Sequence, residues 1–147
     1  MKSHKEKALE LFCSGCNCSQ AVFAAYCEEF GIEKSTALKM TSSLGGGFGR
    51  LREVCGAASG MALVAGLAAG YDNVTDKSLK DEHYKRVQSL MGKFKEKNGS
   101  YICREILKTK DSSPVSTPRN GAFMHERPCI KCVETACEIL DETFFEG

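Results

Sequence analysis

Residues 55–69 read CGAASGMALVAGLAA, a run without a charged side chain around which the rest of the chain is organised. Small and aliphatic residues occupy every side of the helix that this run predicts, which is typical of a helix buried at the centre of a fold. Gly56 and Gly60 lie about one turn apart. They allow another backbone to approach closely, either the helix that begins at Cys18 or the glycine-rich loop 45–49. The same small-residue surface permits a homodimer contact.

Amphipathic periodicity on both sides of this run predicts further helices. Asn17 is a favoured N-cap residue in front of one of them. The segment 108–128 holds all three prolines and is expected to be irregular. The chain is therefore expected to form one all-α domain over residues 1–147, a bundle of about five to seven helices. The expected helices are 3–12, 18–30, 33–43, 55–69, 78–97, 102–107 and 129–145, and the expected inner face of 78–97 holds Tyr84, Val87, Leu90, Met91 and Phe94.

The composition of the 147 residues fits a folded protein, with 42% hydrophobic residues and a formal net charge of +1. A near-neutral chain without a clustered basic face is not expected to bind nucleic acid. The apolar run 61–69 is far too short to span a bilayer, and residues 1–10 lack the apolar segment of a signal peptide. We therefore expect no membrane insertion and a cytoplasmic location.

Nine cysteines are unusual for a cytosolic chain, and an odd number cannot pair completely within it. Because stable disulfides belong to oxidising compartments, redox chemistry or metal binding explains them better than a disulfide framework. Near a helix start, free N–H groups and the helix dipole favour a thiolate, the form that attacks disulfides and binds metals. Arg50 and Arg52 add positive potential close to one such position. The cysteines near expected helix starts are Cys18, Cys55, Cys103 and Cys129.

These four thiols suit two kinds of site if the fold brings them together. One is a dithiol/disulfide relay, and the other is a four-thiolate site for zinc or an iron–sulfur cluster. A third interpretation is packing alone, because a free cysteine is usually a small buried hydrophobe; the chain would then be a helical protein-interaction module.

Two C-x-x-C pairs are also present, Cys13 with Cys16 and Cys129 with Cys132. They lie much further apart than the two halves of a usual zinc site, so redox chemistry is favoured over zinc. Neither pair is followed by a histidine, so no covalent haem is expected.

The glycine-rich loop 45–49 can cradle an anion through its backbone N–H groups. It matches neither the P-loop nor the dinucleotide-binding motif, which favours a tight turn between helices. Its position before Cys55 still lets a substrate, a cofactor or a partner sulfur approach the backbone closely. The glycines expected to allow this approach are Gly45, Gly46, Gly47 and Gly56.

Several of these residues together resemble the C_GCAxxG_C_C family of redox-active proteins. Residues 17–22, NCSQAV, resemble its N-C-x-Q-A-V element, and Gly45-Gly46-Gly47 with residues 55–60, CGAASG, match its G-G-G and C-G-A-x-x-G elements. Cys103 matches the third cysteine and Cys129 the fourth, a position for which Cys132 competes. The resemblance covers nearly the whole chain. The cysteines outside the pattern are Cys13, Cys16, Cys27, Cys132 and Cys137.

The resemblance implies an all-α domain in which four cysteines share a redox role with a partner that the family does not specify. Some members are selenoproteins, which favours thiol chemistry, and a related domain occurs in split-Soret cytochromes. We expect Cys55 to be the nucleophile and Cys18 the resolving thiol, with Cys103 and Cys129 as a second pair or relay. In the alternative interpretation the same four cysteines are ligands of zinc or an iron–sulfur cluster.

Overall fold

The computed structural model describes residues 2–116 and 128–145. The all-α fold expected from the sequence is confirmed, and within these ranges the strand-like pairing is confined to one antiparallel bridge between Val54 and Ile102. The helices are α1 (His4–Cys13), α2 (Cys18–Tyr26), α3 (Lys34–Thr41), α4 (Gly56–Ala69), α5 (Lys77–Asn98), α6 (Cys103–Leu107) and α8 (Cys129–Leu140), with the short helical turns η1 (Cys27–Phe30), η2 (Ser42–Leu44) and η3 (Asp141–Phe145).

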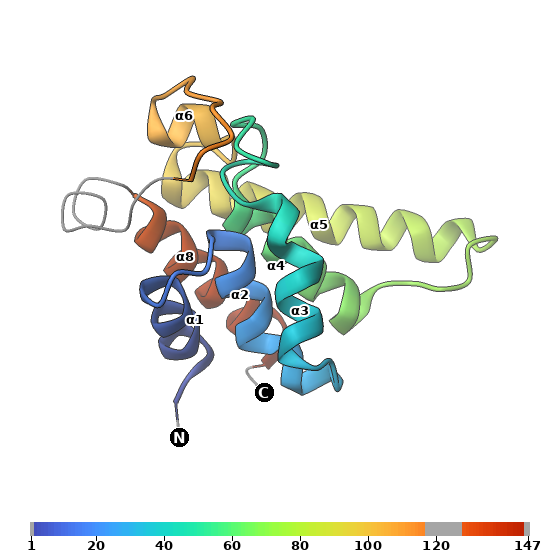
Figure 1. Cartoon of the computed structure of the whole chain (residues 1–147). Helices are drawn as coiled ribbons and strands as arrows, with labels where there is room; N and C mark the ends of the chain where they lie inside the picture. Colours follow the sequence, from blue (N-terminus) through green and yellow to red (C-terminus); the bar gives the residue numbers. More distant parts are fainter. Residues whose placement is uncertain (1, 117–127, 146–147) are drawn as a thin grey trace.

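Helices α2 and α4 pack against each other at the centre of the bundle, with α1, α3, α5 and α8 around them (Figure 1). Residues 21–26 of α2 are all buried. A Cβ added at Gly56 would lie 3.1 Å from the Ser19 nitrogen, and one added at Gly60 would lie 3.0 Å from the Ser19 carbonyl oxygen. The two glycines therefore bring α4 against the start of α2, which confirms the close approach expected from the sequence.

The start of α2 is fixed by the residue expected to cap it. The Asn17 side chain accepts a hydrogen bond from the Gln20 nitrogen at 2.8 Å, and the Gln20 side chain accepts one from the Asn17 nitrogen at 3.0 Å. This reciprocal capping box satisfies two backbone donors at once and fixes where Cys18 begins the helix. The α-helix ends at Tyr26, earlier than expected, and is followed by η1, which ends at Phe30 with Gly31 as its C-cap.

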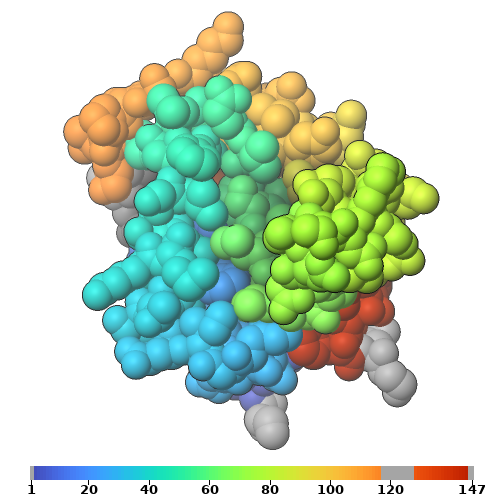
Figure 2. Space-filling view, turned by 90° about the vertical axis from the view of Figure 1, so that its right-hand side faces the viewer, coloured from blue at the N-terminus to red at the C-terminus, as the bar shows by residue number. Residues whose placement is uncertain are grey.

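Helix α5 extends well beyond the bundle, and its first turns face the viewer in Figure 2. Leu90 and Phe94 are buried as expected, but Tyr84 is 54% exposed, so its expected place on the inner face is wrong. The helix has 22 residues and is longer than the bundle against which it packs. No helix in the described part of the chain is long and apolar enough to cross a membrane.

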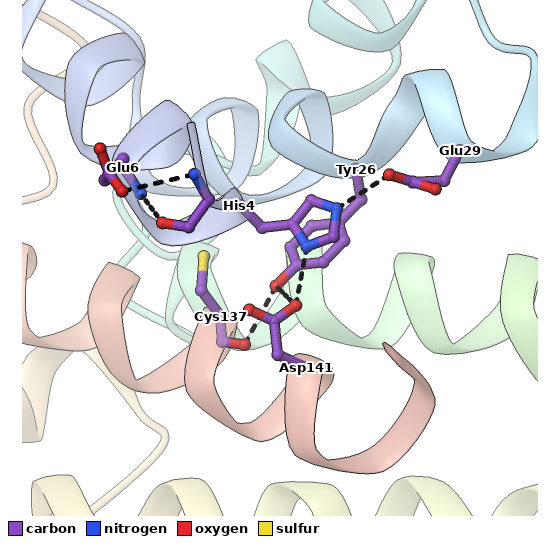
Figure 3. Close-up of polar contacts among 7 residues, drawn as sticks. His4, Glu6, Tyr26, Glu29, Cys137 and Asp141 are labelled. Atoms are coloured by element: carbon purple, nitrogen blue, oxygen red, sulfur yellow. Dashed lines mark hydrogen bonds and ion pairs between the residues drawn. The ribbon is translucent and has the colours of Figure 1, made fainter. Parts of the chain in front are cut away.

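A polar cluster joins the first and last described helical segments to the end of α2 (Figure 3). The His4 ring stacks on Tyr26 with centroids 4.1 Å apart, and its nitrogens contact Asp141 at 2.8 Å and Glu29 at 3.1 Å. The Tyr26 hydroxyl donates to Asp141 at 2.9 Å and to the Cys137 carbonyl at 3.0 Å. These contacts hold α1, α2 and α8 in a fixed arrangement.

Candidate functional site

A cavity of about 480 Å³ lies where the starts of α2, α4, α6 and α8 come together. All four cysteines expected near helix starts line it, and Cys132, one turn into α8, lines it as well. Cys129 and Cys132 both reach the cavity. The structure therefore does not decide which of the two is the fourth cysteine of the pattern. Among the cysteines of the described residues, those outside the lining are Cys13, Cys16, Cys27 and Cys137.

Two of the cavity cysteines are brought together by backbone pairing between distant segments. The Cys55 nitrogen donates to the Tyr101 carbonyl at 2.8 Å, and the Cys103 nitrogen donates to the Glu53 carbonyl at 2.6 Å. The bridge between Val54 and Ile102 lies between these hydrogen bonds. This short ladder positions the start of α6 beside the start of α4.

Cys55 and Cys132 form a hydrogen-bonded thiol pair in the cavity wall. Cys132 donates to Cys55, which lowers the pKa of Cys55 and raises that of Cys132. The backbone N–H groups of Ala58 and Ala57 lower the pKa of Cys55 further, while burial opposes them. Cys55 is the N-cap residue of α4, so the effect of the helix start that was expected from the sequence is present at this cysteine.

The pKa of Cys18 differs from the expectation that a position at a helix start would lower it. Its thiol donates a hydrogen bond to Cys129, and this bond, followed by burial, raises the pKa of Cys18 well above its ordinary value. The negative charge of a thiolate on Cys129 or Cys55 would raise it further. Cys18 is therefore hydrogen-bonded to Cys129, and the expectation that Cys18 resolves a disulfide on Cys55 stays a prediction.

Cys103 lies against a buried arginine. The Arg52 Nη1 atom is 3.8 Å from the Cys103 sulfur. Burial raises the pKa of Cys103, and the Arg52 guanidinium opposes this only in part. The helix start therefore does not make Cys103 a ready thiolate, in contrast to Cys55.

The glycine-rich loop before Cys55 is tightly wound. Phe48, Arg50 and Arg52 have φ values of 74°, 66° and 64°, a conformation that residues with a Cβ rarely adopt. Gly45, Gly46 and Gly47 line the cavity, but an added Cβ would collide with Asn17, Arg50 and Cys103, respectively. The space beside these glycines is thus filled by the protein itself, which matches the tight turn favoured from the sequence. Residues 46–50 and Arg52 all have positive φ, and strained non-glycine residues of this kind are concentrated at functional sites.

The irregular segment 108–116 forms another wall of the cavity. The Arg50 Nε atom donates to the Ser113 carbonyl at 2.7 Å, and the Arg52 Nε atom donates to the Asp111 carbonyl at 2.8 Å. Pro114 and Ser116 line the cavity. Residues 117–127, the rest of the segment expected to be irregular, lie outside the described residues.

The described residues do not offer a ready metal site. Within residues 2–116 and 128–145, no three or more histidine, cysteine, aspartate or glutamate side chains are arranged to hold a metal ion. The thiols are instead hydrogen-bonded in pairs, Cys55 with Cys132 and Cys18 with Cys129. The arrangement suits reactions that need two neighbouring sulfurs.

From the sequence, Cys132 is a competitor of Cys129 and the two are not both expected to line the cavity, although a signal for this is present. Cys129 and Cys132 are three residues apart in an expected helix, a spacing that places both side chains on one face. Either can therefore face the same cavity, and each meets a different partner thiol. The burial of Arg52, 2% exposed, had no comparable signal in the sequence.

A family model described as "Putative redox-active protein (C_GCAxxG_C_C)" matches residues 16–143 of the chain. The matched range includes the five cysteines that line the cavity. No curated protein and no solved structure matches the chain significantly.

Proposed function

Because the chain belongs to the C_GCAxxG_C_C family, we propose that its cavity carries out thiol–disulfide exchange with Cys55 as nucleophile and Cys132 as resolving thiol. The observation that carries this proposal is the hydrogen bond between these two thiols at the start of α4. It lowers the pKa of one partner and raises that of the other, so the pair offers one thiolate to attack and one thiol to follow. Attack by a thiolate is the first step of every such exchange.

The reaction balances as a two-electron exchange. The Cys55 thiolate attacks one sulfur of a substrate disulfide, the substrate S–S bond breaks, and a mixed disulfide forms as one substrate thiolate leaves. Cys132 gives its proton to that leaving thiolate and then attacks the Cys55 sulfur. The second substrate thiolate leaves and takes a proton from water. Two protein thiols are oxidised to one disulfide, and one substrate disulfide is reduced to two thiols.

Cys18 and Cys129 provide a second dithiol in the same proposal. They line the same cavity and are themselves hydrogen-bonded. The raised pKa of Cys18 makes it a poor first nucleophile. It suits a thiol that acts later and passes electrons between the Cys55–Cys132 pair and a partner. Cys103, beside Arg52, lies within the same group.

Trapping the mixed disulfide tests this assignment. Reduced Cys132→Ser protein is treated with bis(2-hydroxyethyl) disulfide at pH 7, and the adduct is located by peptide mass spectrometry. We expect one persistent adduct on Cys55, because the resolving thiol is absent. Cys55→Ser protein should consume the reagent at least about tenfold more slowly than the wild type, because the cavity thiol with the lowered pKa is absent.

Cys13→Ser is the matched control, because Cys13 is exposed and lies outside the cavity lining. It should form the internal disulfide at the wild-type rate. The assignment is wrong if Cys55→Ser retains the wild-type rate, or if the trapped adduct of Cys132→Ser lies on another cysteine.

A further inference from the structure

Arg52 is a buried arginine whose guanidinium does not have a hydrogen-bond acceptor for each of its nitrogens. Its side chain is among the largest that are fully buried, and the residue is 2% exposed. The Nε atom donates to the Asp111 carbonyl and the Nη1 atom contacts the Cys103 sulfur at 3.8 Å. The Nη2 atom is buried and has no hydrogen-bond partner.

The neighbouring carboxylates do not neutralise this guanidinium. Asp111 lies 3.8 Å from the Arg50 Nη2 atom and is largely exposed, and Glu53 pairs with Arg104 at 2.7 Å. Arg52 takes part in no ion pair between described residues. A buried charge without a counter-charge is strongly destabilising, because the lost hydration is not replaced. The fold therefore maintains a costly cation at this position.

The place where this cation lies is the cysteine cavity. Arg52 lines it together with Arg50, Cys55 and Cys103, and no aspartate or glutamate among the described residues lines it. A volume of about 480 Å³ suits a small molecule rather than a protein segment. An anionic group in the cavity would lie beside an arginine that has a buried, unpartnered donor and no ion-pair partner among the described residues, in the cavity that Cys55 also lines.

We propose that the cavity recognises a small disulfide that carries a carboxylate, and that the Nη2 atom of Arg52 binds that carboxylate while Cys55 meets the disulfide sulfur. The planar guanidinium matches a carboxylate better than a compact ammonium does. A bound carboxylate would give Arg52 the ion-pair partner that it does not have among the described residues. This inference rests on the proposed function for its reaction, but the anion site can be measured without any exchange.

The binding test uses an unreactive probe. 3,3′-Thiodipropionate has two carboxylates and a thioether in place of a disulfide, so it binds without reacting. Isothermal titration on reduced wild-type protein should show binding, and Arg52→Gln should weaken it by about tenfold to a hundredfold, the value of a charge-assisted hydrogen bond. Arg104→Gln, which removes a half-buried arginine outside the cavity lining, should bind as the wild type does. Sulfate at the same ionic strength is the comparison that separates carboxylate recognition from general anion binding, and equal affinity for sulfate would overturn the proposal.

The kinetic test compares disulfides of different charge on the wild-type protein, so it does not depend on whether Arg52→Gln folds. 3,3′-Dithiodipropionate should oxidise Cys55 and Cys132 at least about tenfold faster than neutral bis(2-hydroxyethyl) disulfide, and cationic cystamine should be slowest. Equal rates for the three reagents, together with no binding of the thioether, would overturn the anion site and leave the exchange function standing. Thioether binding without any exchange would overturn the function and leave the anion site.

Discussion

Cys132 donates a hydrogen bond to Cys55, and this contact connects the first turn of α8 to the N-cap of α4 inside the cavity. The two residues reach each other only through the packing of α4 against α8. Their ionisation is therefore a property of the folded protein. In the second pair, the hydrogen bond to Cys129 raises the pKa of Cys18, the first residue of α2.

The first prediction concerns the ionisation of Cys55. Its pKa is lowered in the folded state, whereas an unfolded cysteine titrates near about 8.5. The pH at half-maximal alkylation of Cys55 should therefore be lower in native protein than in urea. Unfolding stability should rise with pH between the folded and unfolded pKa values, because the folded state binds fewer protons there. Iodoacetamide labelling resolved by peptide mass spectrometry measures the midpoint, and an equal or higher midpoint in native protein would contradict the account.

The second prediction assigns the cause of that shift. Cys132→Ala removes the donor with the largest lowering effect on Cys55, so the alkylation midpoint of Cys55 should move upward. Cys129→Ala is the matched control in the same helix, and because a charge on Cys129 raises the pKa of Cys55, the midpoint should stay or fall. Equal upward shifts in both variants would show that a general disturbance of the cavity is responsible.

The third prediction tests the close contact between α2 and α4. Replacing Gly60 with alanine forces a Cβ to within 3.0 Å of the Ser19 carbonyl oxygen, and overpacking of this kind costs about 1–3 kcal/mol. Gly66 lies in the same helix with nothing within 4 Å of an added Cβ. Gly66→Ala should therefore stabilise the protein by up to about 1 kcal/mol through helix propensity. Urea unfolding measures both, and a Gly60→Ala protein as stable as Gly66→Ala would rule out the contact.

The fourth prediction concerns the polar cluster that joins α1, α2 and η3. Tyr26→Phe removes the donor to Asp141 and to the Cys137 carbonyl and should cost about 1–2 kcal/mol of unfolding free energy. Tyr84→Phe, at a position 54% exposed, should change stability by less than about 0.5 kcal/mol.

The pH dependence of the same variant provides an independent check. Burial raises the pKa of Tyr26 above its unfolded value of about 10. A group of this kind stabilises the fold below its unfolded pKa, and the contribution is lost as the pH rises past that value. The wild type should therefore lose more stability above about pH 10 than Tyr26→Phe does. Parallel stability curves would contradict the burial of this hydroxyl.

Much of the fold follows from patterns that act locally. The uncharged run 55–69 identifies the central helix because its sides are apolar throughout, and Asn17 identifies the start of α2 because its side chain satisfies a backbone donor in the next turn. The prediction that Tyr84 is buried is wrong because helical periodicity gives only the direction in which a side chain points. It does not show how far the neighbouring helices extend along α5.

The candidate site depends more on tertiary contacts than on sequence pattern. The helix-start argument holds for Cys55. It fails for Cys18, whose pKa is raised by the hydrogen bond to Cys129 and by burial, and for Cys103, whose pKa is raised by burial. Which thiols pair is decided by how α8 packs across α2 and α4. The buried position of Arg52 depends on its left-handed backbone and on the hydrogen bond to the Asp111 carbonyl. No local sequence pattern predicts either feature.

Disulfide mapping of the wild-type protein tests the central claim most directly. Fully reduced protein is oxidised with one equivalent of a small disulfide at pH 7, alkylated and digested, and the linked peptides are identified. The account predicts a link between Cys55 and Cys132 as the first product, with Cys18 and Cys129 still reduced. A first product that joins Cys55 to Cys18, or a cavity in which every cysteine stays reduced, would contradict it.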